Sequence, residues 1–301
     1  MYKRQALLSA ALEGLGARAR VLSAYQLGIT TDDNFCRARV VALDERPLRA
    51  ALAECDVVVV PGGQAVSAQN RPTSLGKNSS DLSAVLLAGM LGLERCEIFS
   101  DACGIYSADP NLLSGVRLVE SVSFDIARTL SLSGAKVLHH AAVGEAQARG
   151  VRIVCRLNRA DYRIGTTIGP AAPPAPFVVL DQRSIVLDLA GPAERAAAGE
   201  RFAALGVPHV ALGGDALAVT CGFFDPVREL AGLGIAAVPR DELLCTVVRG
   251  TDDVRRLLLP RADAVALAQA LHDELHDPLA PASASPSSLA DGLLANLVAS
   301  S

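Results

Sequence analysis

The sequence predicts an α/β protein in which a three-layer αβα domain precedes an α+β domain. Short apolar runs, such as those at 57–60 and 96–99, alternate with helical patterns through the first half of the chain. This alternation is typical of a mainly parallel sheet with helices on both faces, and we expect these two runs to be neighbours in it. The segment "GPAAPPAP" at 169–176 holds four prolines. Proline disfavours helices and central strands, so this segment predicts a semi-rigid linker between the domains.

The first domain is expected to span residues 1–168. Helices are predicted near 4–15, near 47–54, after the polar loop that starts at 73, and twice within 123–150. Strands are predicted in "RARVL", "DVVVVPGG", "CEIFSDA" and "VRIVCRL", and "GITTDDNFCRARVVAL" is predicted to be a polar loop. We expect the sheet to be truncated at one edge, where a copy of the chain or a partner would cover the apolar surface.

The second domain is expected to span residues 177–277. Strands are predicted in "FVVLDQRSIVLDLA" and "IAAVPRDELLCTVVRG", and a hairpin in "HVALGGDALAVTC". Helices are predicted in "PAERAAAGERFAALG", "DPVRELAGLG" and "DDVRRLLLPRADAVALAQALHDELH". This order is typical of an α+β sandwich. Residues 278–301 are rich in Ala, Ser and Pro and are predicted to form a flexible tail.

The composition excludes several classes of function. The chain has 301 residues and a formal net charge of −4, without a basic stripe, so nucleic acid is not an expected partner. No apolar run reaches the length of a membrane span, and residues 1–16 suit an amphipathic helix better than a signal peptide. The cysteines form no C-x-x-C pair, which predicts buried thiols in a reducing compartment and a cytoplasmic location. They are Cys36, Cys55, Cys96, Cys103, Cys155, Cys221 and Cys245.

The stretch "TSLGKNSSD" at 73–81 has the composition of a phosphate-binding loop. It precedes an apolar helical run, and the free backbone N–H groups and dipole of a helix N-terminus favour an anion. Asn78 and Ser79, however, lie where such loops usually have glycine. Asp81 has a simpler interpretation as the residue that caps this helix.

Four motifs between residues 6 and 168 extend this interpretation. They are "GITTDDNFCRARV", "TSLGKNSSDLSAVLLA", "EIFSDACGIYSADP" and "LSGAKVLHHAAVGEAQARGVRIVCR". In order and spacing they resemble the motifs of the aspartate kinases, members of the amino-acid kinase family. The region after the linker resembles the small ACT-type regulatory domains of the same family. The resemblance implies transfer of the ATP γ-phosphate, with Mg²⁺, to the side-chain carboxylate of aspartate, in amino-acid biosynthesis.

The resemblance also implies roles for individual residues. Ser80 and Asp81 would lie at the point of phosphoryl transfer, and Lys77 would bind a substrate carboxylate in place of the family's arginine. Lys136 would face the phosphates, although it could equally be a surface lysine. The nucleotide pocket would contain Ser100, Asp101, Gly104, Ile105, Tyr106, Asp109 and Pro110. The resemblance implies no protein-bound metal, and Asp101, Tyr106 and Asp109 could also be ordinary turn residues.

The chain departs from the family pattern at several positions. Nothing at residues 1–5 resembles the family's K-F-G-G-T-S segment, whose lysine neutralises the migrating phosphoryl group. Ala6 replaces a glutamate that binds the substrate amino group, and Asn111 replaces an arginine. Lysine at 77 also loses the two-pronged geometry of a guanidinium. The family's H-P is His139-His140 here, and the simplest interpretation is an ordinary polar replacement.

Two histidines, His272 and His276, have the i, i+4 spacing of metal ligands. The Glu of a zinc-protease helix is missing and no third ligand is evident, so a solvated helix end is the favoured interpretation.

Three functions therefore stay open. The chain is an aspartate-kinase-type enzyme whose missing segment comes from elsewhere, a pseudokinase that regulates a partner kinase, or a kinase-family enzyme with a different carboxylate acceptor. We expect a homo-oligomer, or a hetero-oligomer with another kinase-family chain.

Overall fold

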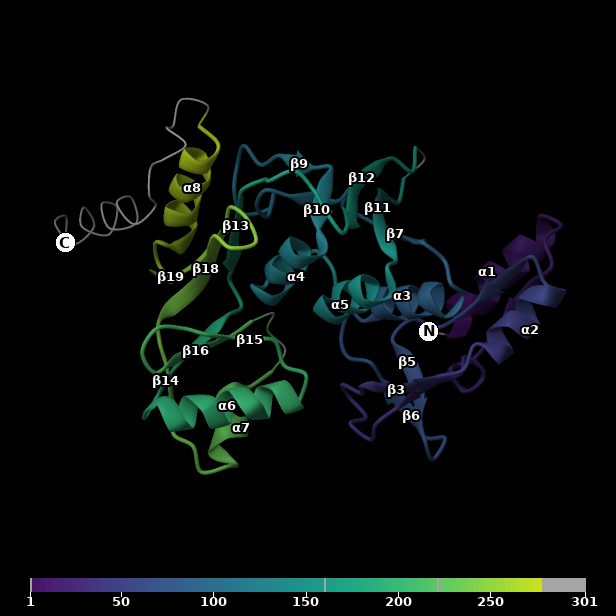
Figure 1. The fold of residues 1–301 in the computed structure, drawn as a ribbon, viewed down its shortest axis with the longest axis horizontal. Helices are drawn as coiled ribbons and strands as arrows, with labels where there is room; N and C mark the ends of the chain where they lie inside the picture. The colour runs from purple at the N-terminus through teal and green to yellow at the C-terminus, as the bar shows by residue number, and fades with distance from the viewer. Residues whose placement is uncertain (1, 160, 221, 223, 278–301) are drawn as a thin grey trace. The chain divides into compact units, whose positions relative to one another are not determined.

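The computed structural model describes residues 2–159, 161–220, 222 and 224–277 (Figure 1). The predicted flexible tail, 278–301, lies outside this part of the chain. The residues form two compact units: one contains the chain up to 103 together with 138–171, and the other contains 104–137 and the chain from 172 onward. The predicted domain limits at 168 and 177 were based on sequence motifs and stay a prediction. The compact units divide the chain differently, because residues 104–137 belong to the second unit.

The first unit has four helices and three small sheets in its described residues. The helices are α1 (Tyr2–Gly14), α2 (Arg46–Glu54), α3 (Ser80–Met90) and α5 (His140–Arg149), with a 3₁₀ turn η1 (Ala24–Gln26). The strands are β1 (Ala19–Val21), β2 (Ile29–Thr31), β3 (Val40–Leu43), β4 (Val57–Val59), β5 (Gln64–Ser67), β6 (Pro72–Ser74), β7 (Arg95–Ser100), β11 (Arg152–Leu157) and β12 (Ile164–Gly169).

Strand pairing in the first unit differs from the prediction. Strand β4 pairs in parallel with β1, and β7 pairs in parallel with β11, so the two apolar runs expected to be neighbours belong to different sheets. The expected polar loop after residue 28 contains β2 and β3, which pair antiparallel, while β2 pairs in parallel with β5. The sheets are therefore mixed rather than mainly parallel. An apolar run predicts a strand, but its neighbour is decided by tertiary packing, which the run does not encode.

Helix α3 lies in the core of the first unit against α5. Its side chains Val85 and Leu86 are fully buried, as are Ala142 and Val143 of α5. Burial of a side chain as large as Val85 or Leu86 contributes about 2 kcal/mol, so this packing holds the two helices together.

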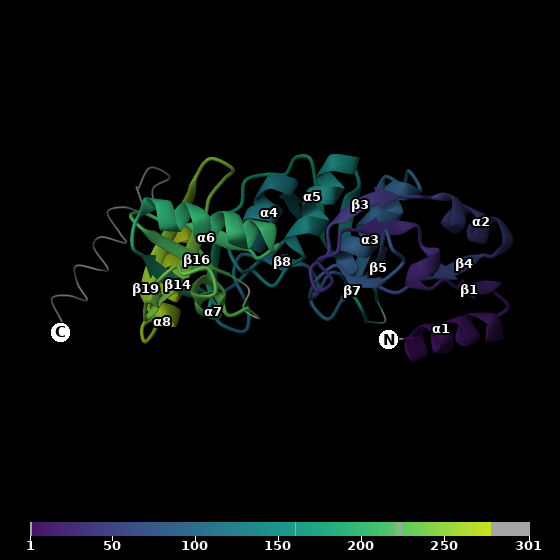
Figure 2. The same ribbon diagram turned by 90° about the horizontal axis from the view of Figure 1, so that it is seen from below.

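The second unit consists of two stacked sheets with helices on the outer faces. One sheet has the order β13 (Phe177–Asp181), β18 (Glu242–Val248), β19 (Val254–Pro260), and the other has β15 (His209–Ala211), β16 (Ala216–Val219), β14 (Ile185–Leu189), β17 (Ala237–Pro239). Helix α8 (Ala264–Leu275) packs on the first sheet, whereas α6 (Pro192–Ala204) and α7 (Pro226–Ala231) pack on the second (Figure 2). The remaining elements are β8 (Ile105–Tyr106), β9 (Leu118–Val119), β10 (Ser121–Ser123) and α4 (Phe124–Leu132).

The side chains of β18 alternate between two core clusters, and this alternation explains why the two sheets stack. Leu243, Cys245 and Val247 belong to the core cluster under α8, while Leu244 packs with Val186 of the facing sheet. Neighbouring residues of a strand point to opposite faces, so one strand supplies both interfaces.

The prediction of one long helix from residue 252 to 276 is wrong for the first half of this segment. Residues 254–260 form β19, which pairs antiparallel with β18 along its whole length. The composition of "VRRLLLP" is compatible with a helix or a strand. The segment forms a strand because it can pair with the edge of β18 that β13 leaves open.

Other expectations have mixed outcomes. Four described cysteines are buried as predicted, but Cys55 is half-buried and Cys36 is exposed, and Cys221 lies outside the described residues. None of the described helices is both long and apolar enough to cross a membrane.

Candidate functional site

The candidate phosphate loop connects β6 to α3 and has the backbone shape of a glycine-rich loop. Gly76 has φ +108° and Asn78 has φ +59°, both in the left-handed region. Asparagine is one of the few residues with a side chain that adopts this region at low cost. The Ser79 hydroxyl donates to the Gly76 carbonyl oxygen at 2.6 Å and closes the turn. Asn78 and Ser79 thus maintain the turn without glycine at their own two positions.

A pair of glycines, Gly62 and Gly63, supports this loop. Gly63 has φ +72°, and a Cβ there would lie 2.8 Å from the Ser79 Oγ; a Cβ at Gly62 would lie 2.8 Å from the Cβ of Ser80. The Gly63 carbonyl accepts from the Leu75 amide at 3.0 Å, and its amide donates to Ser83 Oγ at 2.8 Å. The sequence reasoning missed this role, although "PGG" after a strand is a signal for close backbone approach.

Two of the sequence motifs lie side by side in the first unit. Thr31 of "GITTD" and Thr73 of "TSLGK" are both buried, and their hydroxyl oxygens are 2.8 Å apart. The Ala38 amide donates to the Ser74 carbonyl, and the Ser74 amide donates to the Phe35 carbonyl, each at 2.8 Å. This docking brings the loop after β2 against the start of the phosphate loop.

Asp81, in the first turn of α3, lies beside His139, the N-cap of α5. Burial raises the pKa of Asp81, and hydrogen bonds from the His139 backbone amide and the Ser80 hydroxyl act in the opposite direction. Burial and the nearby charge of Arg37 lower the pKa of His139, so its ring is neutral at pH 7. The His139 and His140 rings stack 4.8 Å apart.

Arg37 was missed by the sequence reasoning. Its position in the loop between β2 and β3, which docks on Ser74, puts its charge close enough to affect the titration of His139. A cation inside the motif "TDDNFCR" was the available signal.

The remaining predicted residues of the first unit lie on its surface. Lys77 and Ser80 are exposed; Lys77 lies in the turn before α3, and Ser80 is the first residue of that helix. Ser100 ends β7, and its hydroxyl donates to the Ala102 carbonyl oxygen at 2.8 Å, which shapes the turn around the exposed Asp101. The structure therefore brings Lys77, Ser80 and Asp81 together at one helix N-terminus.

The second unit holds the other predicted residues. The Lys136 ammonium lies 3.0 Å from an Asp109 carboxylate oxygen, and Asn111 donates to the other oxygen from its amide and its side chain, each at 2.9 Å. Burial acts to raise the pKa of Asp109, but these hydrogen bonds outweigh it and hold the pKa below its usual range. Ile105 is buried, Gly104 and Tyr106 are half-buried, and Pro110 is exposed. Asp109 and Lys136 are thus a preformed ion pair.

The interpretation of His272 and His276 as a solvated helix end is wrong. His272 is only 1% exposed, its Nε2 lies 2.9 Å from Ser107 Oγ, and its ring lies 4.4 Å from that of His276. Burial lowers the pKa of both histidines. Within the described ranges, no group of three or more His, Cys, Asp or Glu side chains is placed to hold a metal ion.

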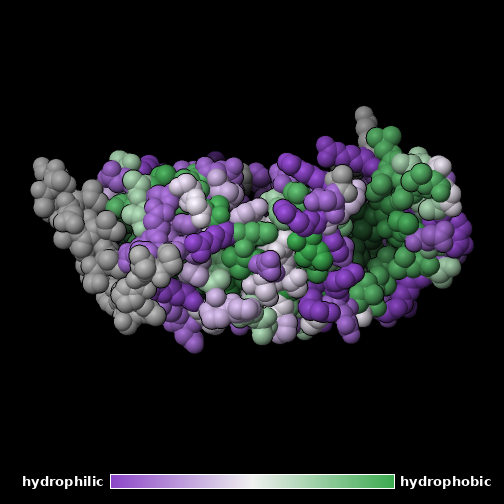
Figure 3. Space-filling model, turned by 90° about the horizontal axis from the view of Figure 1, so that it is seen from above, coloured by the Kyte–Doolittle hydropathy of each residue, from purple (hydrophilic) through white to green (hydrophobic). Residues whose placement is uncertain are grey.

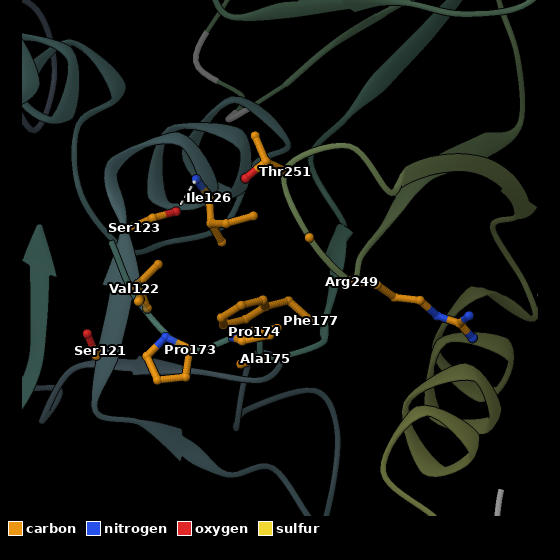
Figure 4. Close-up of a pocket in the computed structure, with 12 residues that line it drawn as sticks. Ser121, Val122, Ser123, Ile126, Pro173, Pro174, Ala175, Phe177, Arg249 and Thr251 are labelled. Carbon is orange, nitrogen blue, oxygen red and sulfur yellow. Dashed lines mark hydrogen bonds between the residues drawn. The ribbon is translucent and has the colours of Figure 1, made fainter. Parts of the chain in front are cut away.

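A cavity of about 230 Å³ in the second unit contains none of the predicted residues (Figure 4). Ile126, Phe177, Pro173 and Pro174 line it, together with polar residues such as Ser121 and Thr251. The Arg249 side chain points away from it in Figure 4.

The first unit is an α/β structure in which a polar turn with left-handed backbone conformations precedes a helix N-terminus. This arrangement is typical of an α/β phosphate-binding protein. Residues 2–156 match the family described as the amino acid kinase family. This match covers just over half of the chain, and the chain belongs to that family.

Its relatives include aspartokinases. The chain is 35% identical over 166 residues to the aspartokinase of Rickettsia bellii, and 37% identical over 163 residues to that of Helicobacter pylori. These matches cover 55% and 54% of this chain but 39% and 40% of the relatives. The chain thus spans about two fifths of the length of these relatives.

Solved structures confirm the predicted fold class. Aspartokinase III of E. coli, in complex with aspartate and ADP, superposes with a TM-score of 0.69 at 20% identity, over 89% of this chain and 72% of that chain. The aspartate kinase of Clostridium acetobutylicum gives a TM-score of 0.60 at 15% identity, over 90% of this chain and 73% of that chain. At these identities the likeness establishes the fold.

Proposed function

We propose that the chain is an aspartokinase-type phosphotransferase that binds ATP and a carboxylate acceptor and turns over slowly in isolation. The acceptor is aspartate or a related acid, held at Lys77, Ser80 and Asp81. The aspartate and ADP in the E. coli relative support these ligand classes. The observation that carries the proposal is the left-handed Asn78, which preserves the shape of a phosphate loop at the N-terminus of α3.

The nucleotide side of the proposal depends on Asp109 and Lys136. The lowered pKa of Asp109 keeps it ionised at neutral pH, which fits a cationic partner, and Mg²⁺ bound with ATP would supply further neutralisation of the phosphates. Lys136 is more than half exposed, so it can turn from Asp109 toward a phosphate. Among the other predicted nucleotide residues, Gly104, Ile105, Tyr106 and Pro110 belong to the same unit as Asp109, whereas Ser100 and Asp101 belong to the first unit.

We expect slow turnover because the described residues place little free positive charge where the phosphates would bind. Phosphoryl transfer needs preorganised positive charge, and the loss of one such group typically costs about 10²–10³ in rate. His139, which lies beside Asp81, has its pKa lowered by burial and by the charge of Arg37, so it adds no positive charge at neutral pH. Lys136 must first leave Asp109.

Nucleotide titration and a hydroxamate assay for acyl phosphate test this function. We expect measurable ATP binding that Asp109→Ala weakens by about tenfold, since its carboxylate would accept a charge-assisted hydrogen bond from the nucleoside; such a bond contributes about 1.5–3 kcal/mol, and solvent exposure reduces it. Asp252→Ala, an exposed carboxylate between β18 and β19, is the matched control. Equal effects of the two substitutions would contradict the nucleotide site, and rapid turnover by the chain alone would contradict the proposed impairment.

A second candidate is a pseudokinase that acts as a partner or regulatory subunit through an ACT-like second unit. Helix α1 and the residue after it favour this candidate, because Leu7, Leu8 and Leu15 are 70%, 51% and 85% exposed, and apolar surface gathers at this end of the first unit (Figure 3). Such surface usually marks an interface. Light scattering that finds a monomer at micromolar concentration would count against a homo-oligomer.

The third candidate is a kinase with another acceptor, and it rests on Lys77. A lysine ammonium is a point charge and, unlike an arginine guanidinium, does not select a carboxylate through two parallel hydrogen bonds. Turnover with a panel of carboxylic acids, with aspartate inactive, would favour it.

A further inference from the structure

The loop from Ser107 to Arg117, which carries Asp109, is built into the core of the second unit. Ala108 and Leu113 belong to the same buried cluster as Leu267 and Leu271 of helix α8. Apolar packing therefore attaches the proposed nucleotide loop to α8 rather than leaving it as a surface loop.

Ser107 is the polar anchor of this loop. It is fully buried, its amide donates to the Arg117 carbonyl at 2.8 Å, and its carbonyl accepts from Val178 at 2.9 Å. Its hydroxyl oxygen accepts from the Arg117 amide at 2.9 Å and lies 2.9 Å from His272 Nε2. Each neighbour of Ser107 thus fixes the backbone two residues before Asp109.

The direction of the hydrogen bond to His272 follows from the surrounding charges. An Asp273 carboxylate oxygen lies 3.8 Å from His272 Nδ1, too far for a hydrogen bond but close enough to favour a proton on that nitrogen. Nε2 is then an acceptor, and the Ser107 hydroxyl donates to it. The chain of bonds runs from the Arg117 amide through Ser107 to His272.

The other polar contacts between the loop and α8 are more exposed. The Ser114 amide donates to Gln269 at 2.8 Å, and the Arg117 guanidinium donates to the His276 carbonyl at 3.4 Å, both in exposed positions. Water competes for such bonds, whereas removal of a partner from a buried bond leaves an unsatisfied group. The Ser107–His272 bond is therefore the contact that specifies the loop position.

We propose that His272 is a positioning residue for nucleotide binding, which fixes the Asp109 loop on helix α8 through the Ser107 hydroxyl. This inference rests on the proposed nucleotide function of Asp109. If the Asp109 loop has its binding conformation in only a fraction of the molecules, the apparent affinity for nucleotide falls in proportion to that fraction. Anything that shifts α8 would then change nucleotide affinity.

Three variants and one control test the role of His272. His272→Leu removes the acceptor, Ser107→Ala removes the donor, and His272→Gln returns an acceptor oxygen near the place of Nε2. His276→Gln, at the C-cap of the same helix, is the control, because the described contacts give its side chain no hydrogen bond to the loop. ADP affinity by calorimetry and amide hydrogen exchange over residues 107–117 are measured on the full chain.

We expect His272→Leu and Ser107→Ala each to weaken ADP binding by about tenfold. The double variant should be no weaker than either single one, because both remove the same bond. His272→Gln should recover most of the affinity, and only the two disruptive variants should accelerate exchange at 107–117. Independent, multiplying effects, or unchanged exchange in His272→Leu, would overturn the inference. If the wild type fails to bind ADP, the nucleotide function is wrong, and the exchange data alone decide whether His272 positions the loop.

Discussion

Substitution of Gly63 by alanine should destabilise the chain more than substitution of a comparable glycine elsewhere. Gly63 has φ +72°, and its new Cβ would lie 2.8 Å from Ser79 Oγ. Alanine in the left-handed region costs about 1 kcal/mol. The Ser79 side chain must also move and lose its hydrogen bond to Gly76, for about 1 kcal/mol more. We therefore expect a loss of about 2 kcal/mol in the free energy of unfolding.

Gly92 provides the matched control. It has φ +69°, but no atom lies within 4 Å of a Cβ built there. Gly92→Ala should thus cost only the backbone term of about 1 kcal/mol. Urea denaturation of both variants measures the difference. In a Ser79→Ala background, Gly63→Ala should cost no more than Gly92→Ala, because the atom that it meets is gone. Equal costs of the two glycine substitutions in the wild-type background would refute the reasoning.

Three further predictions concern other parts of the chain. Asn78→Ala should lower the free energy of unfolding by about 1 kcal/mol while Asn78→Gly leaves it nearly unchanged, because only alanine is strained at φ +59°; equal losses in urea would contradict this. The lowered pKa of Asp109 means that its contribution to stability is present above the unfolded pKa near 3.8 and is lost as pH falls through the folded value. The stability difference between wild type and Asp109→Asn should therefore shrink below about pH 4, and a difference independent of pH would rule out the ion pair. Val238, 64% exposed on the edge strand β17, should support self-association through sheet edges, so Val238→Lys should lower the mass measured by light scattering. Leu233→Lys, at a site that is 50% exposed but outside a strand, should not.

Sequence reasoning recovered most of the elements but fewer of their neighbours. The helices α2, α3, α5 and α6 lie where amphipathic patterns predicted them, since the 3.6-residue period is a local property. The pairing of β4 and β7, and the strand β19, were predicted wrongly, because a strand takes its partner from residues far along the chain.

The candidate site divides in the same way. The motif order alone identified the family and the loop at 73–81, because contiguous residues such as Lys77, Ser80 and Asp81 meet through chain continuity. Only the tertiary structure decided that Asn78 takes a glycine conformation and that Gly63 supports it.

Long-range contacts determined the rest. The sequence by itself specified the α/β class, the family and the chemistry of its motifs, which are encoded in local pattern and residue type. The tertiary structure paired Lys136 with Asp109, lowered the pKa of His139 through burial and the charge of Arg37, and buried His272 against Ser107. These properties depend on burial and on distances between residues remote in sequence, and solvation and charge act through those distances rather than through sequence spacing.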